Sequence, residues 1–224
     1  RCSDNGFTMA YTYGGANTTS TAGRIDVYNY DNVAKIWTQK GTTKYGVNNL
    51  TASHNQGFGV ATGTLGMDKK NLNRIISGGR AYYSSTIRSR GFVNIIEFDS
   101  TTNDWNTVYY QYGTTNFQYL GGHKNGMSGN GNYAFASSFN DTDGTDNGNN
   151  PTYVYERAAD GTWSVNATFT KTNYSDLGNA FSADVDMNYA GDMMVFCDDY
   201  ETGNNAWIYK NISGTWTQQG SYID

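Results

Sequence analysis

The chain has 224 residues, enough for one large all-β domain or two small ones, and its 15 basic and 20 acidic residues leave it net negative. We expect no nucleic-acid partner, because phosphate binding requires a basic face and the sequence has no cluster of Lys and Arg. No apolar run approaches the roughly 18 to 20 residues that cross a bilayer, so no membrane span is predicted. Heavy use of Tyr and Gly with a single Pro favours strands joined by turns.

A short pattern recurs along the chain: an aromatic residue is followed seven or eight residues later by a Trp. The mean interval between these tryptophans is close to that of the longer propeller-blade repeats, about 50 residues. We therefore predict an all-β fold, a β-propeller of about four blades, in one domain with units at 1–50, 51–116, 117–176 and 177–224. The four pairs are Tyr30 and Trp37, Phe98 and Trp105, Tyr155 and Trp163, and Tyr209 and Trp216.

Short apolar runs bounded by Gly, Asn, Asp and Ser predict a four-stranded antiparallel meander in each unit. The first unit differs, because only residues 1–6 precede its first clear strand, and we expect its innermost strand to be missing or truncated. Such an edge leaves unpaired N–H and C=O groups that can recruit a strand. The expected strands are 7–13, 24–30 and 36–40; 57–62, 74–78, 91–98 and 104–110; 119–127, 133–138, 152–156 and 162–169; and 179–186, 193–198, 206–210 and 215–219.

The four repeated tryptophans have two interpretations, packing between blades or stacking on sugars. Their shared position in the repeat favours packing, because Trp buries a large area. Two tyrosine clusters lie outside the repeat and are the better candidates for sugar contact. These are Tyr82 with Tyr83, and Tyr109 with Tyr110 and Tyr112.

The run Gly57-Phe58-Gly59-Val60, the strand that ends in Ser77-Gly78-Gly79, and the run from Gly91 to Ile96 resemble an FG-GAP repeat of integrin α-subunit propellers. The turn from Ser128 to Ala136 is also similar to such repeats in surface proteins. The complete Gly-Ala-Pro tripeptide is absent. The resemblance implies a β-propeller with an extracellular adhesive or structural role, and no catalytic residue.

That resemblance also implies a calcium loop, with side-chain oxygens at the first, third, fifth and ninth positions of a nine-residue stretch. Asp184, Asp186, Asn188 and Asp192 match this spacing, and Ca²⁺ takes six to eight oxygen ligands. The alternative is a polar strand face followed by a plain turn. The family's Gly at the sixth position is Tyr189 here, and we prefer the alternative. Calcium is thus the one cofactor considered, and otherwise none is expected.

Two cysteines lie near the ends of the sequence, Cys2 and Cys197, and form either one disulfide in an oxidising compartment or two thiols. Glycosylation sequons are no more frequent than chance, and remain candidates only on the extracellular interpretation. They occur at Asn17, Asn49, Asn140, Asn166, Asn173 and Asn211.

The two histidines, His54 and His123, have no Cys or Ser arrangement beside them that predicts a nucleophile, and we expect no enzyme. The favoured hypothesis is an extracellular or cell- or virion-surface protein with a structural or adhesive role. In it the chain is a self-assembling subunit of a filament or surface layer, completed by a neighbour's strand. The alternatives are a glycan-binding propeller, calcium-dependent or not, and part of a larger propeller receptor. Expected partners are further copies of the chain, other extracellular proteins, or glycans.

Overall fold

The computed structural model describes residues 1–13, 23–45, 65–70, 72–79, 90–115, 118–138, 151–170, 184–197 and 205–223. Every regular element within these ranges is a β-strand. None of the described residues belongs to a helix long and apolar enough to cross a membrane. The predicted strand 57–62 lies outside the described residues.

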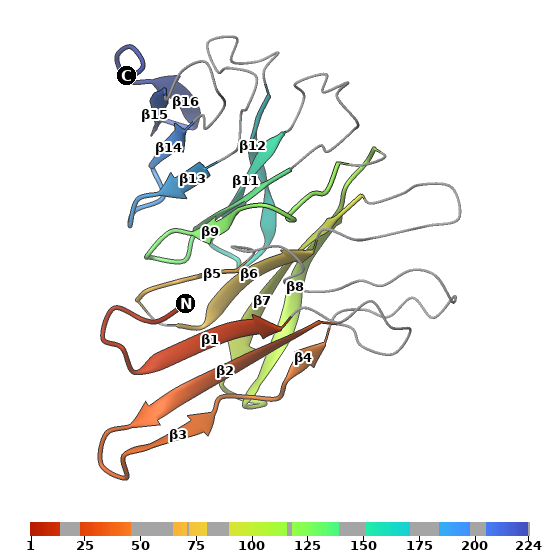
Figure 1. Cartoon of the computed structure of the whole chain (residues 1–224), viewed down its shortest axis with the longest axis vertical. Helices are drawn as coiled ribbons and strands as arrows, with labels where there is room; N and C mark the ends of the chain where they lie inside the picture. The colour runs from red at the N-terminus through yellow and green to blue at the C-terminus, as the bar shows by residue number, and fades with distance from the viewer. Residues whose placement is uncertain are drawn as a thin grey trace.

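The strands form four antiparallel four-stranded sheets, one for each predicted unit, and Figure 1 shows them following one another along the molecule. The predicted all-β propeller of four blades is confirmed. Blade 1 holds β1 (Thr8–Tyr13), β2 (Arg24–Asp31), β3 (Ile36–Gln39) and β4 (Lys44–Tyr45); blade 2 holds β5 (Leu65–Met67), β6 (Arg74–Gly79), β7 (Phe92–Asp99) and β8 (Asp104–Tyr112). Blade 3 holds β9 (Asn125–Met127), β10 (Tyr133–Ser137), β11 (Thr152–Arg157) and β12 (Trp163–Phe169); blade 4 holds β13 (Asp184–Met187), β14 (Met193–Cys197), β15 (Ala206–Ile212) and β16 (Thr215–Gln218).

Within the described residues, blade 1 has no full innermost strand, as predicted. Its fourth strand is β4, which pairs with β2 beside β3. The inner position holds residues 1–3, with Cys2 paired to Met9 as an isolated bridge. The backbone of Arg1 exchanges two hydrogen bonds with Ala10, at 2.9 and 3.0 Å. The innermost strand of this blade is therefore represented by a short stub.

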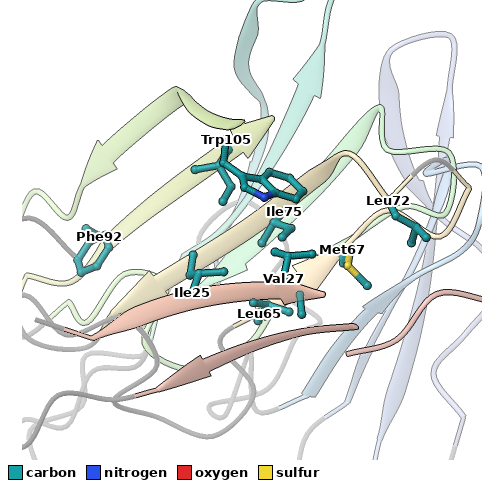
Figure 2. Close-up of a cluster of buried hydrophobic side chains, with 10 residues drawn as sticks. Ile25, Val27, Leu65, Met67, Leu72, Ile75, Phe92 and Trp105 are labelled. Atoms are coloured by element: carbon teal, nitrogen blue, oxygen red, sulfur yellow. The ribbon is translucent and has the colours of Figure 1, made fainter. Parts of the chain in front are cut away.

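The hydrophobic core is divided into three clusters, and each lies between two consecutive blades. Between blades 1 and 2, Ile25 and Val27 of β2 pack against residues of β5 to β8 such as Ile75 and Trp105 (Figure 2). Another cluster joins blade 2 to blade 3, and a third joins blade 3 to blade 4. Because a blade is one sheet thick, it buries a face only by packing on a neighbour.

A Trp at the start of the outer strand joins each of blades 2, 3 and 4 to the blade before it. The indole N–H of Trp105 donates to the Lys40 carbonyl at 2.8 Å, and that of Trp216 donates to Asn166 Oδ1 at 3.0 Å. The indole N–H of Trp163 donates to Glu97 Oε1 at 2.8 Å. All three side chains are buried. The prediction that these tryptophans pack between blades is thereby confirmed for blades 2 to 4.

Glu97 is the centre of the contact between blades 2 and 3. Besides the Trp163 indole, its carboxylate accepts hydrogen bonds from Arg157 at 2.7 and 3.2 Å and lies 3.4 Å from Arg74 Nε. Burial disfavours the charged form of Glu97. The hydrogen bonds from Arg157 and Trp163, together with the positive charges of Arg157 and Arg74, outweigh burial, and the pKa of this carboxyl lies below its ordinary value.

We predict that Glu97→Gln lowers the free energy of unfolding at pH 7 by about 2 kcal/mol, because two guanidinium groups lose a partly buried carboxylate. A lowered folded-state pKa means that ionised Glu97 stabilises the fold above the ordinary carboxyl pKa of about 4.3. This stabilisation is lost as the pH falls through the lower, folded-state value. Denaturant unfolding at a series of pH values measures both effects.

The matched control is Asp4→Asn, which removes an exposed carboxylate from the turn before β1. This variant should unfold like the original chain at every pH. A Glu97→Gln chain that kept the stability of the original chain at pH 7 would show that the carboxylate does not hold the two blades together.

Candidate functional site: a pocket at the inner strands

The inner strands of the blades approach each other closely because two of them carry Gly where they meet. A Cβ added to Gly66 of β5 would lie 2.6 Å from the backbone of Gly126 in β9. Real Cβ atoms essentially never come so close to backbone, so the two strands require Gly at this contact. The turns that follow them are linked as well, because the N–H groups of Lys69 and Lys70 both donate to the Gly129 carbonyl at 3.0 Å.

These inner strands and the stub at residues 1–3 surround a pocket of about 400 Å³, a size suited to a small molecule. All four blades contribute to it. The lining residues are Arg1, Cys2, Gly66, Met67, Lys69, Lys124, Asn125, Gly126, Met127, Phe135, Asp184, Val185, Asp186, Val195 and Cys197.

Charged groups of both signs meet in this pocket. Asp184 and Asp186 lie two residues apart on β13, which places both on one face of the strand. Lys124 Nζ forms an ion pair with Asp184 Oδ1 at 3.1 Å, between blades 3 and 4. Asp186 Oδ1 accepts a hydrogen bond from the N–H of Met187. Lys69 brings a second ammonium group from the turn after β5.

The two cysteines also line this pocket, Cys2 from the stub of blade 1 and Cys197 from the end of β14. Both are free thiols in the structure. Burial, and secondarily the negative charge of Asp184, raise the pKa of Cys197. A thiol with a raised pKa is protonated at neutral pH, so Cys197 is not an activated nucleophile.

The predicted calcium ligands are not gathered around one point. Asn188 Oδ1 accepts the N–H groups of Gly191, Asp192 and Met193, and Asn188 Nδ2 donates to Asp192. Asp184 is paired with Lys124. Within the described ranges, no group of three or more His, Cys, Asp or Glu side chains could hold a metal ion.

The physical reason is that Asn188 occupies a turn position that recurs between the first two strands of a blade. Ser3 and Ser128 hold the same position in blades 1 and 3. Their hydroxyls accept the N–H of Thr8 and Tyr133, respectively, five residues later. The side chain of Asn188 therefore closes a turn.

Two of the six sequons fall on described residues. Asn166 lies on β12, where its Nδ2 donates to Glu156 at 2.7 Å and its Oδ1 accepts the Trp216 indole. A glycan on Asn166 would break this contact between blades 3 and 4, so the structure argues against modification there. Asn211 lies at the β15–β16 hairpin and stays a predicted site. The other four, Asn17, Asn49, Asn140 and Asn173, lie outside the described residues.

Of the two tyrosine clusters predicted to contact sugars, only one falls on described residues. Tyr82 and Tyr83 lie outside the described residues. Tyr109 packs against the buried ring of Tyr155, and Tyr110 stacks on Phe92, so both belong to the core between blades. His54 also lies outside the described part of the chain, and His123 precedes β9 without lining the pocket.

Comparison with protein families finds no match, and comparison with curated proteins finds none either. Solved structures do match. A candidate 6-phosphogluconolactonase from Bacteroides fragilis NCTC 9343 has a TM-score of 0.57 at 13% identity, covering 100% of this chain and 53% of that one. The periplasmic gluconolactonase PpgL of Pseudomonas aeruginosa has a TM-score of 0.49 at 13% identity, covering 91% and 50%.

A third similar structure is the β-propeller domain of the Trilobed protease from Pyrococcus furiosus, with a TM-score of 0.47 at 11% identity, covering 97% of this chain and 55% of that one. The chain thus spans about half the length of each of these three solved structures. At these identities the likeness is one of fold, and it supports a propeller. The narrower FG-GAP assignment remains a resemblance in sequence.

These comparisons correct the expectation of a non-enzymatic protein. The solved protein with a TM-score of 0.57 is a candidate 6-phosphogluconolactonase by name, so the fold of this chain is one that carries enzymes. The prediction of no enzymatic activity, with a structural or adhesive role, is wrong on this finding. The same likeness gives no support to the alternatives of a glycan-binding propeller and of a receptor. The sequence argument looked for a nucleophile with an adjacent base, and such a search does not find polar residues from different units that meet only in the folded chain.

We predict that alkylation of Cys197 in a Cys2→Ser chain rises with pH around a midpoint above the ordinary thiol pKa of about 8.5. Asp184→Asn in the same background should lower that midpoint, because it removes the neighbouring negative charge, and burial should still hold it above 8.5. Iodoacetamide labelling followed by mass spectrometry measures both. A midpoint below the ordinary value would contradict the environment described for this thiol.

Proposed function

We propose that this propeller is a hydrolase that binds a small, negatively charged, sugar-derived lactone in the pocket at the inner strands. The observation that carries the proposal is the meeting there of ammonium groups with the carboxylates of Asp184 and Asp186. Lys69 and Lys124 suit an anionic substrate. The fold shared with a candidate 6-phosphogluconolactonase supports the choice of reaction class.

In this proposal the reaction adds water across the ring ester. Asp186 takes a proton from the water molecule as the water oxygen bonds to the carbonyl carbon. The carbonyl oxygen becomes an oxyanion, which Lys69 stabilises from the neighbouring turn. When the oxyanion collapses, the bond between the carbonyl carbon and the ring oxygen breaks, and the ring oxygen receives the proton from Asp186. The product is the open hydroxy acid.

The two carboxylates have different roles because their surroundings differ. Asp184 is held by Lys124 at 3.1 Å, so its charge is already paired. Asp186 has no ion-pair partner within the described residues and accepts one backbone hydrogen bond. Asp186 is therefore the better proton acceptor, and the pair of Asp184 with Lys124 acts as a positioning element across blades 3 and 4.

The test uses 6-phosphoglucono-δ-lactone and glucono-δ-lactone, with hydrolysis followed by NMR against the uncatalysed rate in buffer. We expect Asp186→Asn to lower kcat/KM by at least about 100-fold, the usual contribution of a general base. Lys69→Met should lower kcat for both lactones about 100-fold, because the oxyanion loses the ammonium group that stabilises it.

The matched control is Asp160→Asn, which removes an exposed carboxylate at the β11–β12 turn, where Asp160 bonds to Thr162. Hydrolysis by this variant should equal that by the original chain. If the original chain accelerated neither lactone above buffer, or if Asp186→Asn kept full activity, the proposed function would be wrong.

We also propose that the protein works outside the cytoplasm, secreted or in the periplasm. Support comes from the extracellular interpretation of the sequence, and the lactonases of similar fold include a periplasmic one. Fractionation of the source cells with an antibody to the chain tests this location. The protein is expected in the periplasmic or secreted fraction, and recovery from the cytosol alone would contradict the proposal.

A further inference from the structure

The first and last blades each have one face that no described blade covers, and these two faces are complementary. We call the face of a blade that bears its outer-strand Trp the leading face, and the opposite face the trailing face. In each internal contact, the leading face of one blade packs on the trailing face of the blade before it. Among the described residues, no blade lies before the leading face of blade 1 and none lies after the trailing face of blade 4.

The leading face of blade 1 carries the same aromatic group that is buried in the other blades. Trp37 is paired across the strands with Tyr30, as Trp105 is with Phe98. Their rings are 5.2 and 5.3 Å apart, respectively. Trp105 is 2% exposed whereas Trp37 is 44% exposed. Among the described residues, no hydrogen bond is made by the Trp37 indole. Tyr11 and Tyr28 stack beside it on this face.

The trailing face of blade 4 carries the groups that receive such a Trp elsewhere. In two of the three internal contacts the acceptor is the residue three positions after the preceding blade's own Trp, namely Lys40 after Trp37 and Asn166 after Trp163. The same position after Trp216 is Gln219, which is exposed. The N–H of Gln219 donates to Ile208 as that of Lys40 donates to Val27, which confirms the equivalence.

The apolar residues on the trailing face of blade 4 also correspond to those on the trailing face of blade 1. Ile208 is opposite Val195 on the neighbouring strand, in the register that places Val27 opposite Ala10 in blade 1. Val27 and Ala10 are buried under blade 2. Val195 and Ile208 are only half-buried, because no described blade covers them. With Gln219 they form a surface that resembles the trailing face of blade 1, which packs on the leading face of blade 2.

We propose that two copies of the chain associate head to tail, with blade 1 of each packed on blade 4 of the other, to close a ring of eight blades. A second copy is the occupant because its trailing face supplies the apolar pair and the acceptor that Trp37 lacks. Two contacts of one kind then close the assembly. The whole chain covers 53% of a solved propeller, so two copies span one complete ring.

Sedimentation equilibrium on the full chain tests this association. The original chain should have twice its own mass of 24.7 kDa at micromolar concentration. Trp37→Ala should weaken the dimer more than tenfold, because an aromatic anchor at the centre of a contact carries much of the binding energy. Val33→Ala is the control, since Val33 is 92% exposed at the β2–β3 turn, and it should leave the dimer unchanged.

A mixing experiment distinguishes the head-to-tail arrangement from a symmetric contact between two leading faces. Trp37→Ala and Ile208→Asp chains should each be monomeric and folded by circular dichroism, because Ile208→Asp places a charge in the apolar part of the trailing face. When mixed they should form a heterodimer, because the intact Trp37 of one chain meets the intact trailing face of the other. A monomeric original chain, a mass that grows without limit, a Trp37→Ala chain that stays dimeric, or no recovery on mixing would each overturn the proposal.

Discussion

The fold depends on one contact repeated along the chain, in which the indole N–H of an outer-strand Trp donates to the preceding blade. A blade is a single sheet, so its apolar side chains are buried only where another blade covers them. The burial of apolar area favours the contact between two blades but does not fix their relative orientation. The hydrogen bonds of Trp105, Trp163 and Trp216 fix how each blade sits on the one before, because a buried indole N–H left unpaired is costly.

The pocket follows from the same arrangement. Once consecutive blades are fixed at their outer strands, their inner strands converge, and Gly66 and Gly126 allow β5 and β9 to meet backbone to backbone. Polar side chains at the ends of these strands then face a common space. The ion pair of Lys124 with Asp184 illustrates this, because its two members come from different blades. The site that we propose for lactone hydrolysis is thus formed by the packing of the blades on one another. No described blade covers the leading face of blade 1 or the trailing face of blade 4.

Much of the fold could be predicted from the sequence, because each blade carries its own local signals. The period of the Trp positions gave the four units, and alternating apolar residues gave most strands, with bounds such as 74–78 against the observed Arg74–Gly79. The strand β4 was missed, because two residues after a Gly turn have no alternation to detect. The pocket could not be predicted, since Lys69, Lys124 and Asp186 lie in different units and meet only through the ring geometry. Asn188 matched the spacing of a calcium loop, but a plain turn was the preferred alternative, and Ser3 and Ser128 at equivalent positions accept the same backbone N–H.

A double-mutant cycle on Glu97 and Trp163 tests most directly whether these contacts hold the blades together. Trp163→Phe keeps the ring and removes only the N–H that donates to Glu97 at 2.8 Å. Unfolding free energies would be measured for the original chain, Glu97→Gln, Trp163→Phe and the double variant. The account predicts a coupling free energy of about 1 kcal/mol or more between the two sites. Additive effects, with a coupling indistinguishable from zero, would contradict it.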